Sequence, residues 1–290
     1  MPKTKTAIVT GGGGYLGSAI ALELAAEGWD IVVTYLDDIA ECADVLGQLE
    51  ALGRKSLALP CDAGIKSQVD RFYQILADQL GQSPDLLVNN AGVQTWSSLL
   101  DLKEDDWDRV IRTNLKGCFL NTQAVARWMV RDKRPGRIVN IGSGCNQIPF
   151  QNLVDYTASK GGIEMLTKVA AVELGAYGIT VNCVAPGAIE TERTRQESPD
   201  YAGDWAKITP IGRVGTPQDV ANAVCFLAED RSSFITGQTV NVDGGVFTRA
   251  NWPYKAYESG TEHKDAGPDH GQILGGRREY MAPPLNSSAE

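Results

Sequence analysis

The chain has 290 residues, of which 43% are hydrophobic, and this is enough to build one large folded domain. Its 36 acidic and 27 basic residues give a formal charge of -9 without any long basic run, which argues against a nucleic-acid or anionic-membrane partner. No apolar run approaches the roughly 20 residues of a membrane helix, and the segment after Met1 does not resemble a secretory leader, so we expect a cytoplasmic protein.

Short runs rich in β-branched residues alternate with longer helical patterns along the chain. This alternation predicts an α/β fold of the Rossmann type, a doubly wound parallel sheet of about seven strands with helices on both faces. We expect residues 1–250 to form a single domain whose ligands lie at the carboxyl ends of the strands. The predicted strands are Ala7–Thr10, Ile31–Tyr35, Ser56–Pro60, Leu86–Asn89, Arg137–Ile141, Ile179–Val184 and Thr239–Val242.

A glycine-rich loop follows the first predicted strand and opens a helix that runs to about Gly28. Glycines allow the backbone to approach a pyrophosphate closely, and the positive end of the helix favours its charge, so we expect a dinucleotide to bind here. Two spacings fit the four successive glycines, one starting at Gly12 and one at Gly11, and both include Gly14 and Gly17.

The residues after the second strand bear on which dinucleotide binds. Asp37 and Asp38 lie where an acid contacts the ribose hydroxyls, and two carboxylates would repel the 2′-phosphate of NADP. The sequence therefore favours NAD. NADP stays open, because Arg54 and Lys55 could fold back toward this position and because the two acids could be solvated or cap a helix beginning near Ile39.

Tyr156 and Lys160 lie one turn apart at the start of a strongly helical segment that ends near Tyr177. A neighbouring ammonium stabilises a phenolate, which suits a tyrosine to acid–base chemistry. A Y-x-x-x-K pair is common by chance, and its usual meaning is a surface contact. Here Ser143 follows the fifth strand thirteen residues upstream, where the loops converge, and its hydroxyl can meet the oxygen of a substrate.

Further asparagines accompany this group, in Asn89–Asn90–Ala91–Gly92 after the fourth strand and at Asn114 within a helical run from about Glu104 to Val130. With the glycine loop, Asp62, Ser143, Tyr156, Lys160 and Pro186–Gly187-x-x-x-Thr191, they make the sequence resemble the short-chain dehydrogenase/reductase family from Lys5 to about Gly245. The spacing Gly11, Gly14 and Gly17 is similar to the extended branch of that family, whereas everything downstream resembles the single-domain branch.

The resemblance implies a catalytic tetrad of Asn114, Ser143, Tyr156 and Lys160. Tyr156 would be the general acid or base, Ser143 would orient the substrate oxygen, and Lys160 would bind the ribose and tune the tyrosine, with Asn114 supporting a water relay. Among the implied cofactor contacts, Asp62 would meet adenine and Thr191 the carboxamide. The whole implied set is Gly11, Gly14, Tyr15, Leu16, Gly17, Tyr35, Asp37, Asp62, Ala63, Asn89, Ala91, Gly92, Tyr156, Lys160, Pro186, Gly187, Ile189 and Thr191.

The loops after the strands supply the expected substrate contacts, namely Gln94, Ser143, Cys145, Gln147, Tyr156 and Arg193. Their many hydrogen-bonding groups favour a sugar or polyol over an acyl chain. We therefore expect an NAD(P)-dependent dehydrogenase acting on a secondary alcohol or carbonyl. A 3-oxoacyl reductase is the alternative within the same chemistry, and a dinucleotide-binding sensor without turnover is the alternative of another class.

Residues 251–290 extend past the usual family end near Gly245, as a partly ordered arm or a flexible tail. The resemblance makes a homotetramer the expected assembly, with this arm as a possible contact to a neighbouring subunit. A helical stripe containing Ile163, Leu166 and Val169 could face a partner or be ordinary core. We expect no metal site, since His263 and His270 lack ligand spacing, and the dispersed cysteines indicate reduced thiols.

Overall fold

The computed structural model of the protein describes residues 4–248. Seven strands within them form one sheet in the order β3-β2-β1-β4-β5-β6-β7, and every neighbouring pair is parallel. The strands are β1 (Thr6–Val9), β2 (Asp30–Tyr35), β3 (Ser56–Pro60), β4 (Leu86–Asn89), β5 (Gly136–Ile141), β6 (Ile179–Pro186) and β7 (Thr239–Val242). The predicted doubly wound α/β fold is therefore confirmed. The predicted extension 251–290, with His263 and His270, lies outside the described residues.

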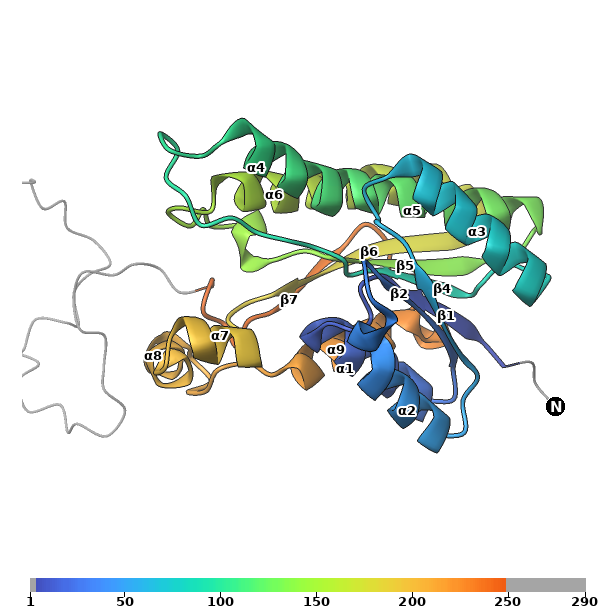
Figure 1. The fold of residues 1–290 in the computed structure, drawn as a ribbon, viewed down its shortest axis with the longest axis horizontal. Coiled ribbons are helices and arrows are strands. Elements are labelled where there is room, and N and C mark those ends of the chain that lie inside the picture. Colours follow the sequence, from blue (N-terminus) through green and yellow to red (C-terminus); the bar gives the residue numbers. More distant parts are fainter. Residues whose placement is uncertain (1–3, 249–290) are drawn as a thin grey trace, which may run out of the picture. The chain divides into compact units, whose positions relative to one another are not determined.

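Helices cover the sheet on both faces, as the ribbon shows (Figure 1). One layer contains α1 (Tyr15–Ala26), α2 (Ala43–Ala51) and α9 (Pro217–Ala228), and the other contains α3 (Lys66–Leu80), α5 (Gly117–Arg131) and α6 (Val154–Leu174). Three shorter helices are α4 (Glu104–Val110), α7 (Glu192–Glu197) and α8 (Tyr201–Ile208). No helix in the described part of the chain is long and apolar enough to cross a membrane.

Two hydrophobic cores explain why the central strands are mostly apolar. Ala7 and Val9 of β1 pack into the core beneath α1 and α9, while Ile8 between them packs into the core beneath α3 and α5. Side chains of a strand alternate between the two faces of a sheet, and here both faces are buried. The near-continuous apolar runs in the sequence follow from that double burial.

The helical run expected from about Glu104 to Val130 is present, although its middle part is not α-helical. After α4, residues Ile111–Lys116 form a π-helical turn before α5 begins at Gly117. Such wide turns arise where one extra residue is accommodated in an α-helix, often at functional sites. Asn114 lies within this turn and is completely buried.

The order of the strands reverses between β1 and β4, and the loops that follow them are joined by hydrogen bonds. The Asn90 side-chain amide donates to the carbonyl oxygens of Thr10 (2.9 Å) and Gly11 (3.1 Å). The Thr10 hydroxyl in turn accepts from the backbone N–H groups of Asn90 and Ala91. In open α/β sheets ligands bind at this reversal point, outside the carboxyl ends of the strands.

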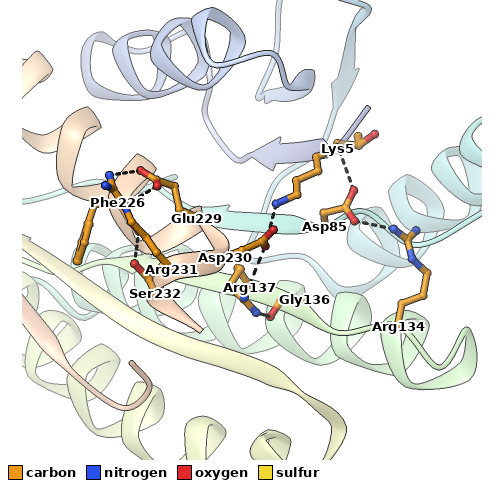
Figure 2. Close-up of polar contacts among 11 residues, drawn as sticks. Lys5, Asp85, Arg134, Gly136, Arg137, Phe226, Glu229, Asp230, Arg231 and Ser232 are labelled. Carbon is orange, nitrogen blue, oxygen red and sulfur yellow. Dashed lines mark hydrogen bonds and ion pairs between the residues drawn. The ribbon is translucent and has the colours of Figure 1, made fainter. Parts of the chain in front are cut away.

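Charged pairs lie at the opposite edge of the sheet, at the amino ends of the strands (Figure 2). The Asp85 carboxylate accepts from Arg134 (2.6 Å) and from the backbone N–H of Thr6 (2.9 Å), and both charged side chains are mostly buried. Lys5 pairs with Asp230 at 2.9 Å, but the Asp230 side chain is 84% exposed. Only the first of these pairs is shielded from water.

Replacing Asp85 by Ala should lower the free energy of unfolding by about 2 kcal/mol, because it removes the carboxylate partner of the mostly buried Arg134 guanidinium and leaves the backbone N–H of Thr6 without its acceptor. Asp230→Ala is the matched control and should change it by less than about 1 kcal/mol, since exposed ion pairs contribute little. Urea unfolding followed by circular dichroism measures both. Equal losses in the two variants would contradict this account of the amino-end pairs.

Candidate active site

A cleft of about 1180 Å³ lies along the carboxyl ends of the strands. Pockets for single small molecules measure roughly 300–1000 Å³, so this cleft has room for a dinucleotide and a second molecule. Most residues expected at a cofactor or substrate site line it. They are Gly11, Gly14, Tyr15, Leu16, Gly17, Tyr35, Asp62, Ala63, Ala91, Gly92, Gln94, Ser143, Cys145, Tyr156, Lys160, Pro186, Gly187, Ile189, Thr191 and Arg193.

Two expected cofactor contacts do not line the cleft. The Asn89 side chain points into the core, where it donates to Thr122 (3.0 Å) and Asn140 (2.8 Å), and the next residue, Asn90, lies at the cleft instead. Asp37 is exposed on the surface beyond the end of β2. Asn89 is the last residue of β4, a strand that is buried throughout, whereas Asp37 lies two residues beyond the end of β2.

The glycine loop between β1 and α1 fits a pyrophosphate. An ideal Cβ atom on Gly17 would lie 2.3 Å from the carbonyl oxygen of Gly11, and one on Gly13 would lie 2.3 Å from that of Glu41, so side chains are excluded at both positions. Gly11 has a φ of 62°, in the left-handed region. Helix α1 begins after Gly14 without any side-chain cap, which leaves its first N–H groups to an anionic ligand.

The part of the cleft after β2 and β3 receives no basic side chain from the segments that follow these two strands, although Arg112 of the π-helical turn packs beside Gly64 and also lines the cleft. It is lined by Thr34, Tyr35, Leu36, Glu41, Cys61, Asp62 and Ala63. Arg54, which we expected could fold back toward this position, instead donates to the carbonyl oxygen of Gly28 at 3.0 Å. Burial raises the pKa of the Cys61 thiol to about 12, so that this group is neutral near pH 7.

Ser143 begins a tight turn immediately beyond β5. Its hydroxyl accepts from the backbone N–H of Cys145 (3.2 Å), while the Asn146 side chain accepts from the backbone N–H of Ser143 (3.3 Å). These two bonds cap the short 3-10 helix Gly144–Asn146 and fix the hydroxyl at the wall of the cleft. Gln147, expected to contact substrate, follows this turn, is exposed and does not line the cleft.

Tyr156 and Lys160 both line the cleft from the first turns of α6. The Lys160 ammonium is almost fully buried and donates to the carbonyl oxygen of Ile141, the last residue of β5, at 2.7 Å. Its nitrogen lies 5.3 Å from the centroid of the Tyr156 ring. The lysine therefore sits between the end of a strand and the tyrosine, and its positive charge acts on the phenol at short range.

Asn114 is close to this pair but does not line the cleft. Its side-chain amide donates to the carbonyl oxygen of Val93 (2.8 Å) and to the Ser159 hydroxyl (3.0 Å), and its oxygen accepts from the Val93 N–H (2.8 Å). The Ser159 hydroxyl donates in turn to the carbonyl oxygen of Tyr156 (2.7 Å). Asn114 thus ties the loop after β4 to the helix that carries the tyrosine and lysine.

The substrate end of the cleft is more aromatic than the sequence indicated. Tyr201 and Trp205 of α8 line it, with ring centroids 6.1 Å apart, together with Phe150 and Phe247. Burial raises the pKa of the Tyr201 phenol to about 12, with nearby Arg193 opposing the shift, so this phenol is neutral near pH 7. The only sequence signal for these residues, Phe247 included, was that their segments follow strands.

Comparisons with known proteins agree with this geometry. The family model described as enoyl-(acyl carrier protein) reductase matches residues 15–247. The chain belongs to the short-chain dehydrogenase/reductase family. The 3-oxoacyl-[acyl-carrier-protein] reductase FabG of Staphylococcus epidermidis is 40% identical over 243 residues, which are 84% of this chain and 99% of that protein.

Two further members of the family act on other compounds, according to their names. The (2S)-[(R)-hydroxy(phenyl)methyl]succinyl-CoA dehydrogenase subunit BbsD of Thauera aromatica is 40% identical over 249 residues, covering 84% of this chain and 96% of that subunit. A crystal structure of acetoin dehydrogenase from Enterobacter cloacae is 36% identical with a TM-score of 0.80, and the match covers 88% of this chain and all of that one. The chain is therefore an oxidoreductase of the short-chain type.

Replacing Gly17 by Ala should weaken NADH binding at least tenfold, because the added methyl group would displace the glycine loop. Gly47→Ala in α2 is the matched control, since an added Cβ there meets no atom within 4 Å, and it should leave binding unchanged. Quenching of protein fluorescence by NADH measures both dissociation constants. Undiminished affinity in the Gly17 variant would exclude the loop as the pyrophosphate site.

Proposed function

We propose that this protein is an NAD-dependent dehydrogenase that interconverts a secondary alcohol and a ketone on a small polar compound such as a sugar or polyol. The observation that carries the proposal is the meeting of Ser143, Tyr156 and Lys160 with the glycine loop in one cleft. A bound nicotinamide would supply the acceptor or donor of the hydride. The protein's own residues must then position the substrate oxygen and exchange one proton with it.

The Tyr156 phenol is the proton-exchanging group in this proposal. It takes the hydroxyl proton of the substrate during oxidation and returns one to the carbonyl oxygen during reduction. Lys160, fixed by the Ile141 carbonyl, stabilises the phenolate that forms in the first case. The Ser143 hydroxyl, oriented by the turn after β5, holds the substrate oxygen beside the phenol. Asn114 acts as a positioning residue through Val93 and Ser159, and its support of a water relay remains a prediction.

Support for a sugar or polyol comes from the substrate end of the cleft. Gln94, Arg193, Glu197 and Ser198 bring hydrogen-bonding groups beside the aromatic rings. Hydrogen-bonding groups suit hydroxyls, and aromatic faces suit the C–H surface of such a compound. A second candidate is a 3-oxoacyl thioester reductase, which is favoured by the 40% identity to FabG. The presence of Ser143, Tyr156 and Lys160 together in the cleft argues against a sensor without turnover, because a protein that only binds the dinucleotide needs no group that exchanges a proton.

We further propose that copies of the chain associate into a homotetramer through the outer surface of α5 and α6. Of the stripe noted in the sequence, Ile163 is core, whereas Val169 is 56% exposed. Met165 and Val172 lie on the same side of α6 as Val169 and are also exposed, as is Phe119 of α5. A face of this kind is the sort of apolar patch that protein partners cover. The cytoplasmic location and the contact by residues 251–290 also remain proposals.

Replacing Tyr156 by Phe should lower kcat at least a hundredfold and leave the NADH dissociation constant within about twofold, because only proton exchange is lost. Absorbance at 340 nm follows turnover with aldoses, polyols and 3-oxoacyl thioesters. Tyr177→Phe is the control, since Tyr177 is exposed at the far end of α6 and lines no part of the cleft. Cofactor binding without turnover of any compound by the wild type would favour the sensor, and turnover of thioesters alone would reject the sugar or polyol.

The wild-type protein should bind NADH at least tenfold more tightly than NADPH, because Glu41 and Asp62 line the part of the cleft after β2 and β3 and their negative charges would repel a 2′-phosphate. Glu41→Gln should narrow the difference by removing one negative charge. Calorimetric titration with each reduced cofactor gives the four dissociation constants. Tighter binding of NADPH by the wild type would overturn the cofactor assignment.

A further inference from the structure

The segment that follows β7 reaches the serine turn and contributes a ring to the substrate end of the cleft. Phe247 lines the cleft together with Phe150, and their rings meet edge to face with centroids 5.6 Å apart and an interplanar angle of 88°. The two residues come from loops almost a hundred positions apart in the sequence. Together they form a continuous aromatic wall.

The Phe247 ring lies directly against the backbone beside Ser143. An ideal Cβ atom on Gly144 would lie 1.9 Å from the Phe247 ring, so only a glycine at position 144 allows this contact. Gly144 separates Ser143 from Cys145, and both of these residues line the cleft. The ring is therefore within one residue of the hydroxyl that would hold the substrate oxygen.

The position of Phe247 is fixed by hydrogen bonds within its own segment. The Asp243 carboxylate accepts from the backbone N–H groups of Gly245 (2.9 Å) and Phe247 (3.2 Å). Asp243 itself packs against Gly187, where an ideal Cβ atom would lie 2.7 Å from the Cβ of Asp243. Gly187 lines the cleft and donates to the carbonyl oxygen of Val242 (2.9 Å). Hence the segment that carries Phe247 packs against the loop containing Gly187, which would contact the cofactor.

We infer that Phe247 is a specificity-determining residue, which limits the size of the substituent carried by the reacting carbon of the substrate. This inference rests on the proposed function. A ring that contacts Phe150 and Gly144, and whose backbone is held by Asp243, cannot yield to a bulky group, because moving it would disturb Phe150 and the serine turn together. Compounds whose reacting carbon bears a small substituent fit beside the ring, and those bearing a phenyl group are excluded by it.

The test is the preference between two diols and two oxo esters that differ only in bulk. Oxidation of 1,2-propanediol is compared with that of 1-phenyl-1,2-ethanediol, and reduction of ethyl acetoacetate with that of ethyl benzoylacetate. In Phe247→Ala the ratio of kcat/KM for the phenyl compound to that for the methyl compound should rise at least tenfold, since the removed ring leaves room for the phenyl group. Phe234→Ala is the matched control, since Phe234 is fully exposed away from the cleft, and its ratio should equal that of the wild type.

Gly144→Ala provides an independent variant, because its methyl group would push the ring out of place. Its kcat/KM for the methyl compounds should fall at least tenfold, and Gly144→Ala combined with Phe247→Ala should recover most of the loss. Turnover with an unchanged ratio in Phe247→Ala, or no recovery in the double variant, overturns the inference alone. No turnover of any probe by the wild type overturns the proposed function and this inference with it.

Discussion

The burial of one positive charge organises this active site. The Lys160 ammonium has almost no contact with water, and a buried cation is stable only with a partner that compensates for lost hydration. Its partner is the carbonyl oxygen of Ile141, at the point where β5 ends. This bond fixes how α6 docks on the sheet, and α6 carries Tyr156. Close docking of α6 on the wide turn is also required, and Gly162 allows it, since an ideal Cβ atom there would lie 2.7 Å from Leu115.

The sequence contained enough information to predict the sheet and most of the cleft, for a physical reason. Strands buried on both faces are mostly apolar, so short apolar runs indicate where they lie, and every predicted strand overlaps an observed one. Because parallel strands end at one edge, the residues after them meet there. Gly17, Ser143 and Tyr156 could therefore be placed together without coordinates.

What could not be predicted depends on the orientation of single side chains. Asn89 and Asn90 are identical in type, yet one lies in the core and the other at the cleft, because the strand ends between them. Gln147 was expected at the substrate and is exposed, since the turn from Ser143 carries it outward. Phe247 follows the last strand, but nothing in the sequence indicates which other loop it meets. Its place follows from a contact with Gly144, about a hundred residues away in the sequence.

The π-helical turn at Ile111–Lys116 affects the sequence pattern of the helices on either side of it. An α-helix advances about 100° per residue, so the residue accommodated in the wide turn offsets the facing of everything after it. The residues that face the core in α4 and those that do so in α5 therefore do not follow one continuous repeat along the sequence. Asn114 lies in the turn where the first repeat ends and the second begins. Deleting a single residue here would convert the wide turn into an ordinary α-helical turn and alter the position from which Asn114 bonds Val93 and Ser159. A single α-helical period therefore cannot describe the pattern of buried residues from α4 to the end of α5.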